Sequence, residues 1–391
     1  MCSPLRLFVC MASTRTTTIS SASVLLLLIF GSSQLLAGGQ DSVRKELDRL
    51  DWQPTWAVPG TQYVGREICA ECHAETAAAQ KTSAMGAALA LPAESSVLQQ
   101  HPRLTFGQGP YRYTVEREKN IVSYTLSDGA HTVSVPVSWV FGYGMAEIGQ
   151  TYLLFYSGSY YESRVSFFTT LQGLDITLGH SSAVPASLLD ALGRVVKPEE
   201  LRTCFGCHAT SAVSNGRLQL DRLVAGITCE GCHGPGAEHV AAVKSRSLQQ
   251  LHIFNPATLG AGDLVKFCGA CHRTRAHVEE LHVQGTLTVR FQPYRLTESR
   301  CFSTRDRRIS CVACHDPHRN PEHEPGFYDS KCLACHGSRK RKELTEAAVP
   351  GCPLASSRCV TCHMPKYALA GSHFKFTDHK IRVVRLGDTF D

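Results

Sequence analysis

Cys204-Phe205-Gly206-Cys207-His208 and Cys229-Glu230-Gly231-Cys232-His233 are two copies of one five-residue pattern, Cys-x-x-Cys-His, in a chain of 391 residues. The pattern occurs seven times and uses 14 of the 18 cysteines. The other five copies are Cys69, Cys72 and His73; Cys268, Cys271 and His272; Cys311, Cys314 and His315; Cys332, Cys335 and His336; and Cys359, Cys362 and His363. A pattern repeated this often predicts that the chain is organised around whatever these residues bind.

The order of residues in the pattern is that of a c-type haem attachment site. The two thiols bond to one edge of the porphyrin, and the adjacent histidine is the proximal ligand of the iron. Zinc is the alternative, because paired Cys-x-x-Cys units also build tetrahedral sites. Zinc does not require a histidine directly after every second cysteine, and all seven copies have one. The sequence therefore predicts seven covalently bound haem c groups.

The spacing of the copies limits the kind of core that the chain can form. Six copies lie between residues 204 and 363, which leaves about 27 residues for each. So short a segment cannot bury a self-sufficient hydrophobic core. We expect short helices and loops there, with the haem groups supplying the apolar interior.

A different pattern follows the first copy. Residues 111–117 and 121–126 alternate between polar and apolar side chains, and Asp128-Gly129 is a hairpin turn signal. We therefore expect a β-rich insertion over residues 101–185. It separates a first haem-binding segment, residues 66–100, from a multihaem domain with six sites, residues 186–391.

The N-terminal residues 1–37 have the composition of an export signal. Arg6 and Arg15 precede a short apolar run at residues 24–30, far below the ~18 residues that span a bilayer. Residues 38–65 contain Pro54 and Pro59 and are expected to form a linker. The expected location is the periplasm or another exported site, without a transmembrane span.

Two cysteines of the exported chain lie outside the motifs, Cys301 and Cys352. An even remainder in an oxidising compartment predicts a disulfide between them. The net charge of +6 does not predict nucleic-acid binding, because each haem adds two propionates. Many arginines are better explained as bidentate partners of those carboxylates.

A six-coordinate haem also needs a distal ligand on the face opposite the proximal histidine. His318 lies three residues after His315, too few to pass around the porphyrin, so as a ligand it must serve a neighbouring haem. The same argument holds less tightly for His239, six residues after His233. Met85 is either a packing residue or an axial ligand.

Several stretches together resemble the cytochrome c-554-related multihaem cytochromes, especially the exported bacterial group. They are Cys229-Glu-Gly-Cys-His-Gly-Pro-Gly-Ala-Glu-His239, Ser299-Arg-Cys-Phe302, Cys311-Val-Ala-Cys-His-Asp-Pro-His318, and Cys359-Val-Thr-Cys-His-Met-Pro-Lys366 with Thr377-Asp-His379. The resemblance covers roughly residues 66–90 and 200–385.

The resemblance implies a mostly α, loop-rich multihaem cytochrome c fold with bis-histidine haems in stacked pairs. It implies that His239, His318 and His379 are distal ligands, with His180 as a further candidate. Relatives often carry a histidine in a Ser-x-His setting where this chain has Ser83-Ala-Met85.

Two classes of function remain open at this point. The first is electron transfer along the haem chain, between donor and acceptor redox proteins. The second is a multihaem oxidoreductase that acts on a small nitrogen or sulfur compound at a five-coordinate haem. None of the seven motifs carries the lysine that often marks multihaem nitrite reductases. Near Cys311, an arginine cluster fits either an anionic substrate or haem propionates; its members are Arg300, Arg305, Arg307 and Arg308.

Overall fold

The computed structural model describes residues 43, 45–142, 149–337, 352, 357–385 and 387–390. The chain divides into a unit that ends at Lys45 and a second unit, Glu46–Asp391, to which all elements below belong. The predicted export signal, residues 1–37, lies outside the described residues. Among the residues described, no helix has the length and hydropathy needed to cross a membrane.

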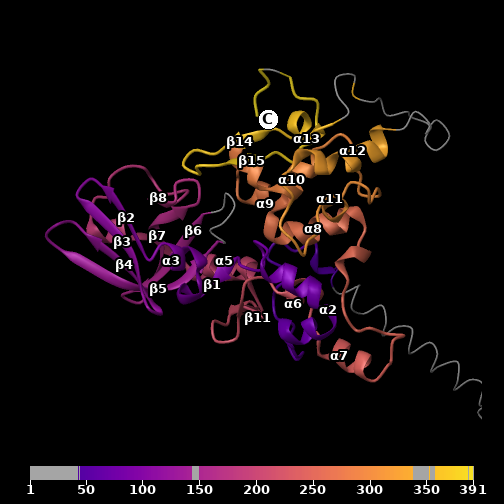
Figure 1. Ribbon diagram of the computed structural model, residues 1–391, viewed down its shortest axis with the longest axis horizontal. Helices are drawn as coiled ribbons and strands as arrows, with labels where there is room; N and C mark the ends of the chain where they lie inside the picture. Colours follow the sequence, from indigo (N-terminus) through magenta and orange to yellow (C-terminus); the bar gives the residue numbers. More distant parts are fainter. Residues whose placement is uncertain are drawn as a thin grey trace, which may run out of the picture. The chain divides into compact units, whose positions relative to one another are not determined.

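The largest element of regular structure is a nine-stranded antiparallel sheet (Figure 1). Seven consecutive strands follow one another in the order β2 to β8, while β1 pairs with β5 and β9 pairs with β7. Strands β2 and β8 also contact each other, so the sheet curls toward closure. Its strands are β1 (Leu89–Ala90), β2 (Arg103–Gln108), β3 (Tyr111–Glu118), β4 (Ile121–Ser127), β5 (Thr132–Phe141), β6 (Gln150–Tyr156), β7 (Ser159–Phe168), β8 (Gly173–Ile176) and β9 (Gly193–Val196).

Alternating side chains of the central strands form the core of this sheet. In β3 and β4, Tyr113 is paired with Leu126 and Val115 with Tyr124, and all four side chains are buried. Cross-strand pairs of this kind are the main stabilising contacts of an antiparallel sheet. This core contains no cysteine of the Cys-x-x-Cys-His motifs.

A second apolar cluster joins the sheet to a haem motif. Phe205, within the second motif, is fully buried and makes edge-to-face contacts with Trp139 and Phe141 of β5, with ring centroids 5.6 and 5.3 Å apart. Such aromatic pairs contribute about 0.5–1.5 kcal/mol beyond their burial. The sheet is thus packed against the second motif rather than separate from it.

The motifs lie on helices, most of them short. In chain order we number the motifs 1 to 7, and the helices that carry them are α2 (Arg66–Lys81), α5 (Pro198–His208), α6 (Cys229–His233), α8 (Ala261–His272), α11 (Cys311–Cys314), α12 (Asp329–His336) and α13 (Cys359–His363). The other α-helices are α3 (Ser96–Gln100), α4 (Leu188–Leu192), α7 (Ala237–Lys244), α9 (Arg275–Glu280) and α10 (Gln292–Thr297). The described residues also form short two-stranded pairs: β10 (Ala209–Thr210) with β13 (Val224–Ala225), β11 (Val213–Ser214) with β12 (Arg217–Leu218), and β14 (Lys366–Ala368) with β15 (Lys375–Thr377).

The expectation of a mostly α fold is wrong, because the nine-stranded sheet makes the protein a mixed α and β structure. Period-two alternation located strands within residues 101–185, but the sheet also takes in β1 before this segment and β9 after it. Pairing between strands distant in sequence is not visible in local periodicity. The domain boundaries inferred from the sequence remain predictions.

Candidate haem sites

All seven motifs have the same local backbone arrangement. Helical spacing places the two cysteines, at positions i and i+3, on the same face, as one porphyrin edge requires. The helix then ends at the motif histidine in motifs 2, 3, 4, 6 and 7, and one residue earlier in motif 5. Helix α2 continues beyond its motif, but His73 within it has non-helical φ and ψ of −117° and 43°. At every motif the backbone therefore leaves helical geometry at the histidine or directly beside it.

Three motif histidines are held in the tautomer that a haem iron needs. The Nδ1 atoms of His208, His233 and His363 donate to the carbonyl oxygens of Ala88, Phe254 and Arg382, at 3.0, 2.8 and 2.8 Å. A histidine that donates from Nδ1 to a carbonyl presents Nε2 as the metal ligand. These residues therefore fit a haem iron.

Two pairs of histidine rings have the spacing expected of axial ligands. The rings of His233 and His318 lie 6.1 Å apart, centre to centre, and are nearly parallel at 4°. The rings of His315 and His379 lie 6.2 Å apart. Imidazole rings in direct contact would be separated by about 3.5–4.0 Å. Two metal–nitrogen bonds of about 2.0–2.1 Å each, plus about 1.1 Å from each nitrogen to its ring centre, give about 6.2–6.4 Å.

The two distal members of these pairs are themselves oriented. His318 Nδ1 lies 3.1 Å from Asp316 Oδ1, and His379 Nδ1 donates to the Thr377 carbonyl at 3.1 Å. Burial lowers the pKa of His379 to about 4, with a further contribution from His315. The imidazole is therefore neutral at pH 7 and keeps a lone pair for coordination.

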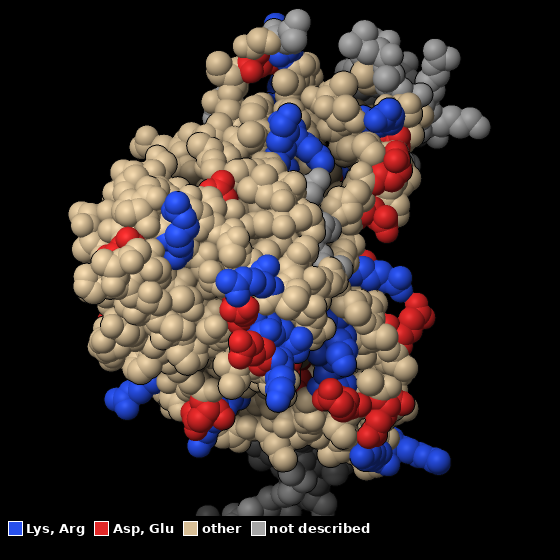
Figure 2. Space-filling model, turned by 60° about the vertical axis from the view of Figure 1, so that its left-hand side comes forward, with Lys and Arg blue, Asp and Glu red and all other residues tan. Residues whose placement is uncertain are grey.

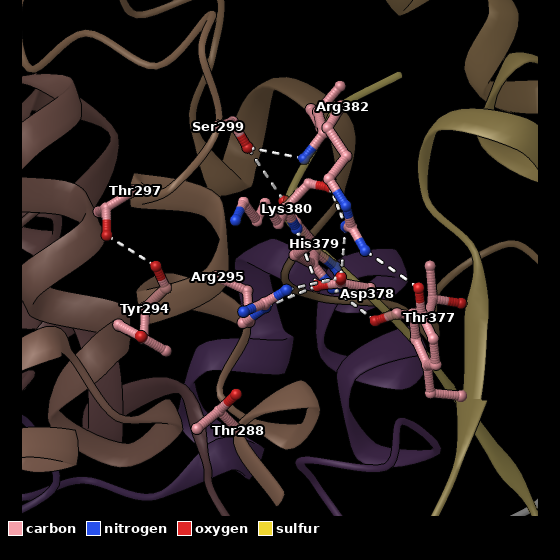
Figure 3. A network of polar contacts seen from close by, with 12 residues as sticks. Thr288, Tyr294, Arg295, Thr297, Ser299, Thr377, Asp378, His379, Lys380 and Arg382 are labelled. Carbon is pink, nitrogen blue, oxygen red and sulfur yellow. Dashed lines mark hydrogen bonds and ion pairs between the residues drawn. The ribbon is translucent and has the colours of Figure 1, made fainter. Parts of the chain in front are cut away.

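A buried ion network fixes the segment that carries His379 (Figure 3). Arg295 of α10 donates from Nε and Nη2 to the two carboxylate oxygens of Asp378, both at 2.8 Å. The side chains of Arg295 and Asp378 are 2% and 0% exposed. Arg382 Nη1 donates to the same carboxylate at 2.6 Å and Arg382 Nη2 to the Tyr367 hydroxyl at 3.0 Å. The positive charges of Arg295 and Arg382 therefore compensate the buried negative charge of Asp378, which directly precedes the candidate ligand His379.

Motifs distant in sequence bring their thiols together. Cysteines of different motifs are neighbours in four places: Cys69 with Cys229, Cys207 with Cys271, Cys268 with Cys311, and Cys332 with Cys359. Gln53, which is only 4% exposed, accepts from both Cys207 and Cys271, at 3.5 and 3.0 Å. Motifs 1 and 3, 2 and 4, 4 and 5, and 6 and 7 are thus direct neighbours.

The other candidate ligands lie in different settings. His239 donates from Nδ1 to the Leu251 carbonyl at 2.7 Å, the arrangement found at His208, His233 and His363. His180 directs Nε2 to a carboxylate oxygen of Glu162 at 3.1 Å, so that nitrogen faces an acid. Met85 is half-buried, and its carbonyl accepts from the Ile227 amide at 2.9 Å.

Two further sequence-based expectations concern surface groups. The structure does not show a disulfide between Cys301 and Cys352, whose side chains are both exposed.

In the arginine cluster, Arg308 pairs with Asp306 at 2.6 Å, and Arg307 donates to the Ala257 carbonyl. On the face in Figure 2, basic side chains are interspersed with acidic ones. Within the described part of the chain, no three His, Cys, Asp or Glu side chains converge as a metal-ion site would require.

Comparison with known proteins gives one family match. Residues 181–234, which contain motifs 2 and 3, match the family described as cytochrome c554 and c-prime. Among solved structures, the outer cell wall cytochrome OcwA is similar with a TM-score of 0.46 and 16% sequence identity, over 83% of this chain and 80% of that one. No curated protein matches the sequence.

Proposed function

We propose that this chain is an exported heptahaem cytochrome that transfers electrons along a chain of covalently bound haems. The match of residues 181–234 to the cytochrome c554 and c-prime family supports the proposal. The observation that carries the proposal is the pair of histidine couples, His233 with His318 and His315 with His379, at 6.1 and 6.2 Å. A bis-histidine haem has no open coordination position, which suits electron transfer rather than substrate binding.

Each motif would hold one haem c by its two cysteines and by its histidine as proximal ligand. Haem iron supplies a reversible one-electron couple whose potential depends on its axial ligands and on burial. His318 would complete the iron of motif 3, and His379 that of motif 5. His239 is a distal candidate for another motif. The protein's own contribution is to hold these imidazoles in a fixed orientation through their hydrogen bonds.

The contacts between motifs support a continuous path. Thiol neighbours connect motifs 1 and 3, 2 and 4, 4 and 5, and 6 and 7. His318, just after motif 5, reaches the ring of motif 3. The segment after motif 7 returns to motif 5 through His379, while its Arg382 carbonyl holds His363. All seven motifs therefore belong to one connected set, with motif 5 at its junction.

The proposal predicts the haem number and spin state of the purified protein. We expect the intact mass to exceed that of the processed polypeptide by seven haem groups, and we expect the ferric spectrum to be low-spin. One high-spin haem that binds cyanide or nitrite would favour the oxidoreductase alternative instead. Fewer than seven haem additions would contradict the heptahaem proposal.

The export proposal has a separate test at Cys301 and Cys352. If both thiols meet an oxidising compartment, they should resist alkylation in the unfolded protein until a reductant is added. The Cys301→Ser variant should then expose one reactive thiol, at Cys352. Alkylation of both cysteines in the unreduced wild-type protein would exclude the disulfide without affecting the haem assignment.

A further inference from the structure

Glu230, the second residue of motif 3, is a buried carboxylate with an unusual set of partners. It is 4% exposed and accepts three backbone N–H groups: Val64 at 2.9 Å, Gly65 at 2.9 Å and Gly236 at 2.8 Å. Gly65 is the N-cap of α2, the helix of motif 1. A negative charge at this end of a helix is favourable, because the first N–H groups have no partner within the helix.

The partners of Glu230 are not local. Glu230 and Gly65 are 165 residues apart in sequence, so this contact is not the usual capping of a helix by its own flanking residue. The carboxylate belongs to motif 3 and holds the start of the motif 1 helix. In the same place, the thiols of Cys69 and Cys229 are neighbours.

Asp329 repeats the arrangement elsewhere in the chain. It is the first residue of α12, which carries motif 6, and it accepts the N–H groups of Arg358 at 2.6 Å and Cys359 at 2.9 Å. Cys359 is the first residue of α13 and the first cysteine of motif 7. Here too the thiols of the two motifs, Cys332 and Cys359, are neighbours.

We propose that Glu230 and Asp329 are positioning residues that clamp pairs of haem sites, motifs 1 and 3 in the first case and motifs 6 and 7 in the second. This inference rests on the proposed function, since the clamps matter only if the motifs carry haem. Each carboxylate accepts hydrogen bonds from backbone N–H groups at or just before the start of the partner motif. It would thereby fix the separation of the two porphyrins. Electron passage between haems depends steeply on that separation.

The test compares holoprotein variants that remove the same charge from different places. Glu230→Gln keeps the size of the side chain but replaces one acceptor oxygen by an NH₂ group that faces backbone donors. Glu71→Gln is the matched control. Like Glu230, Glu71 lies between the two cysteines of a motif, here motif 1 on α2, but its side chain is exposed. Asp329→Asn tests the second clamp independently.

We expect Glu230→Gln to keep seven haems but to raise amide hydrogen exchange around Val64, Gly65 and Gly236 by at least about tenfold, as the loss of a charge-assisted hydrogen bond implies. The electron paramagnetic resonance signature of magnetic interaction between haems should change as well. Asp329→Asn should produce the corresponding changes only around residues 358–363. Glu71→Gln should leave the exchange rates and the haem–haem interaction as in the wild type.

Unchanged exchange and unchanged haem–haem interaction in both Glu230→Gln and Asp329→Asn would overturn the clamp proposal. Equal effects in Glu71→Gln would also overturn it, because charge alone would then account for them. If Glu230→Gln does not mature, Asp329→Asn decides the question, since Asp329 is only partly buried. A wild-type mass without seven haems would instead refute the proposed function, and the two failures are thus distinguishable.

Discussion

His318→Ala is expected to convert one low-spin haem to high spin while all seven haems stay attached. The His318 ring lies 6.1 Å from that of His233, at the spacing of two imidazoles on one iron. Removing it would leave the proposed motif 3 iron with His233 as its sole axial ligand. The attachment of that haem depends on Cys229 and Cys232, which the variant does not touch. Electron paramagnetic resonance of the ferric protein measures the number of high-spin haems.

The matched control is His323→Ala, an exposed histidine five residues further along the same segment. It should leave the spectrum unchanged. His379→Ala should produce one high-spin haem at a different site, so the double variant should show two. An unchanged low-spin count in His318→Ala would exclude this residue as a ligand.

Asp378→Asn is expected to cost about 3–5 kcal/mol of unfolding free energy, because it leaves two arginine charges against a neutral amide. Arg295 and Asp378 are almost completely buried and share two hydrogen bonds of 2.8 Å. Burial by itself raises the pKa of Asp378, but the hydrogen bonds from Arg295, the Lys380 amide and Arg382 outweigh it and lower the pKa overall. Guanidinium titrations followed by circular dichroism measure the loss.

Two comparisons show whether the ion network is responsible. Arg295→Met should cost less than Asp378→Asn, because Arg382 still compensates the remaining carboxylate. Asp388→Asn alters an exposed aspartate on the same C-terminal segment and should stay within about 0.5 kcal/mol of the wild type. A difference below about 1 kcal/mol for Asp378→Asn would mean that the network contributes little to stability.

The sequence was most informative where chemistry constrains single residues. The motif order Cys-x-x-Cys-His predicts both attachment and ligation, and the three-residue gap between His315 and His318 excludes a shared iron. In the structure, the His318 ring lies beside His233 and the His315 ring beside His379. Both are contacts between segments that are far apart in sequence, and the ligand roles of these histidines remain predictions.

The fold class and the contacts of the Glu230 and Asp378 carboxylates could not be predicted from the sequence. Period-two alternation marked individual strands, but it gave no sign that β1 and β9 would join the same sheet. The role of Glu230 had no local signal, because Val64 and Gly65 precede it by 166 and 165 residues. Asp378 had one local signal, its place directly before a candidate ligand, yet its pairing with Arg295 depends on tertiary packing.

The sheet has a consequence for how the protein matures. Its core is built from side chains such as Tyr113, Tyr124 and Leu126 and contains no motif cysteine. We therefore expect this region to fold without a cofactor, before any haem is attached to the motifs. Phe205 packs against that region through Trp139 and Phe141. If the motifs bind haem as proposed, motif 2 would be held against an already folded surface when its haem is attached.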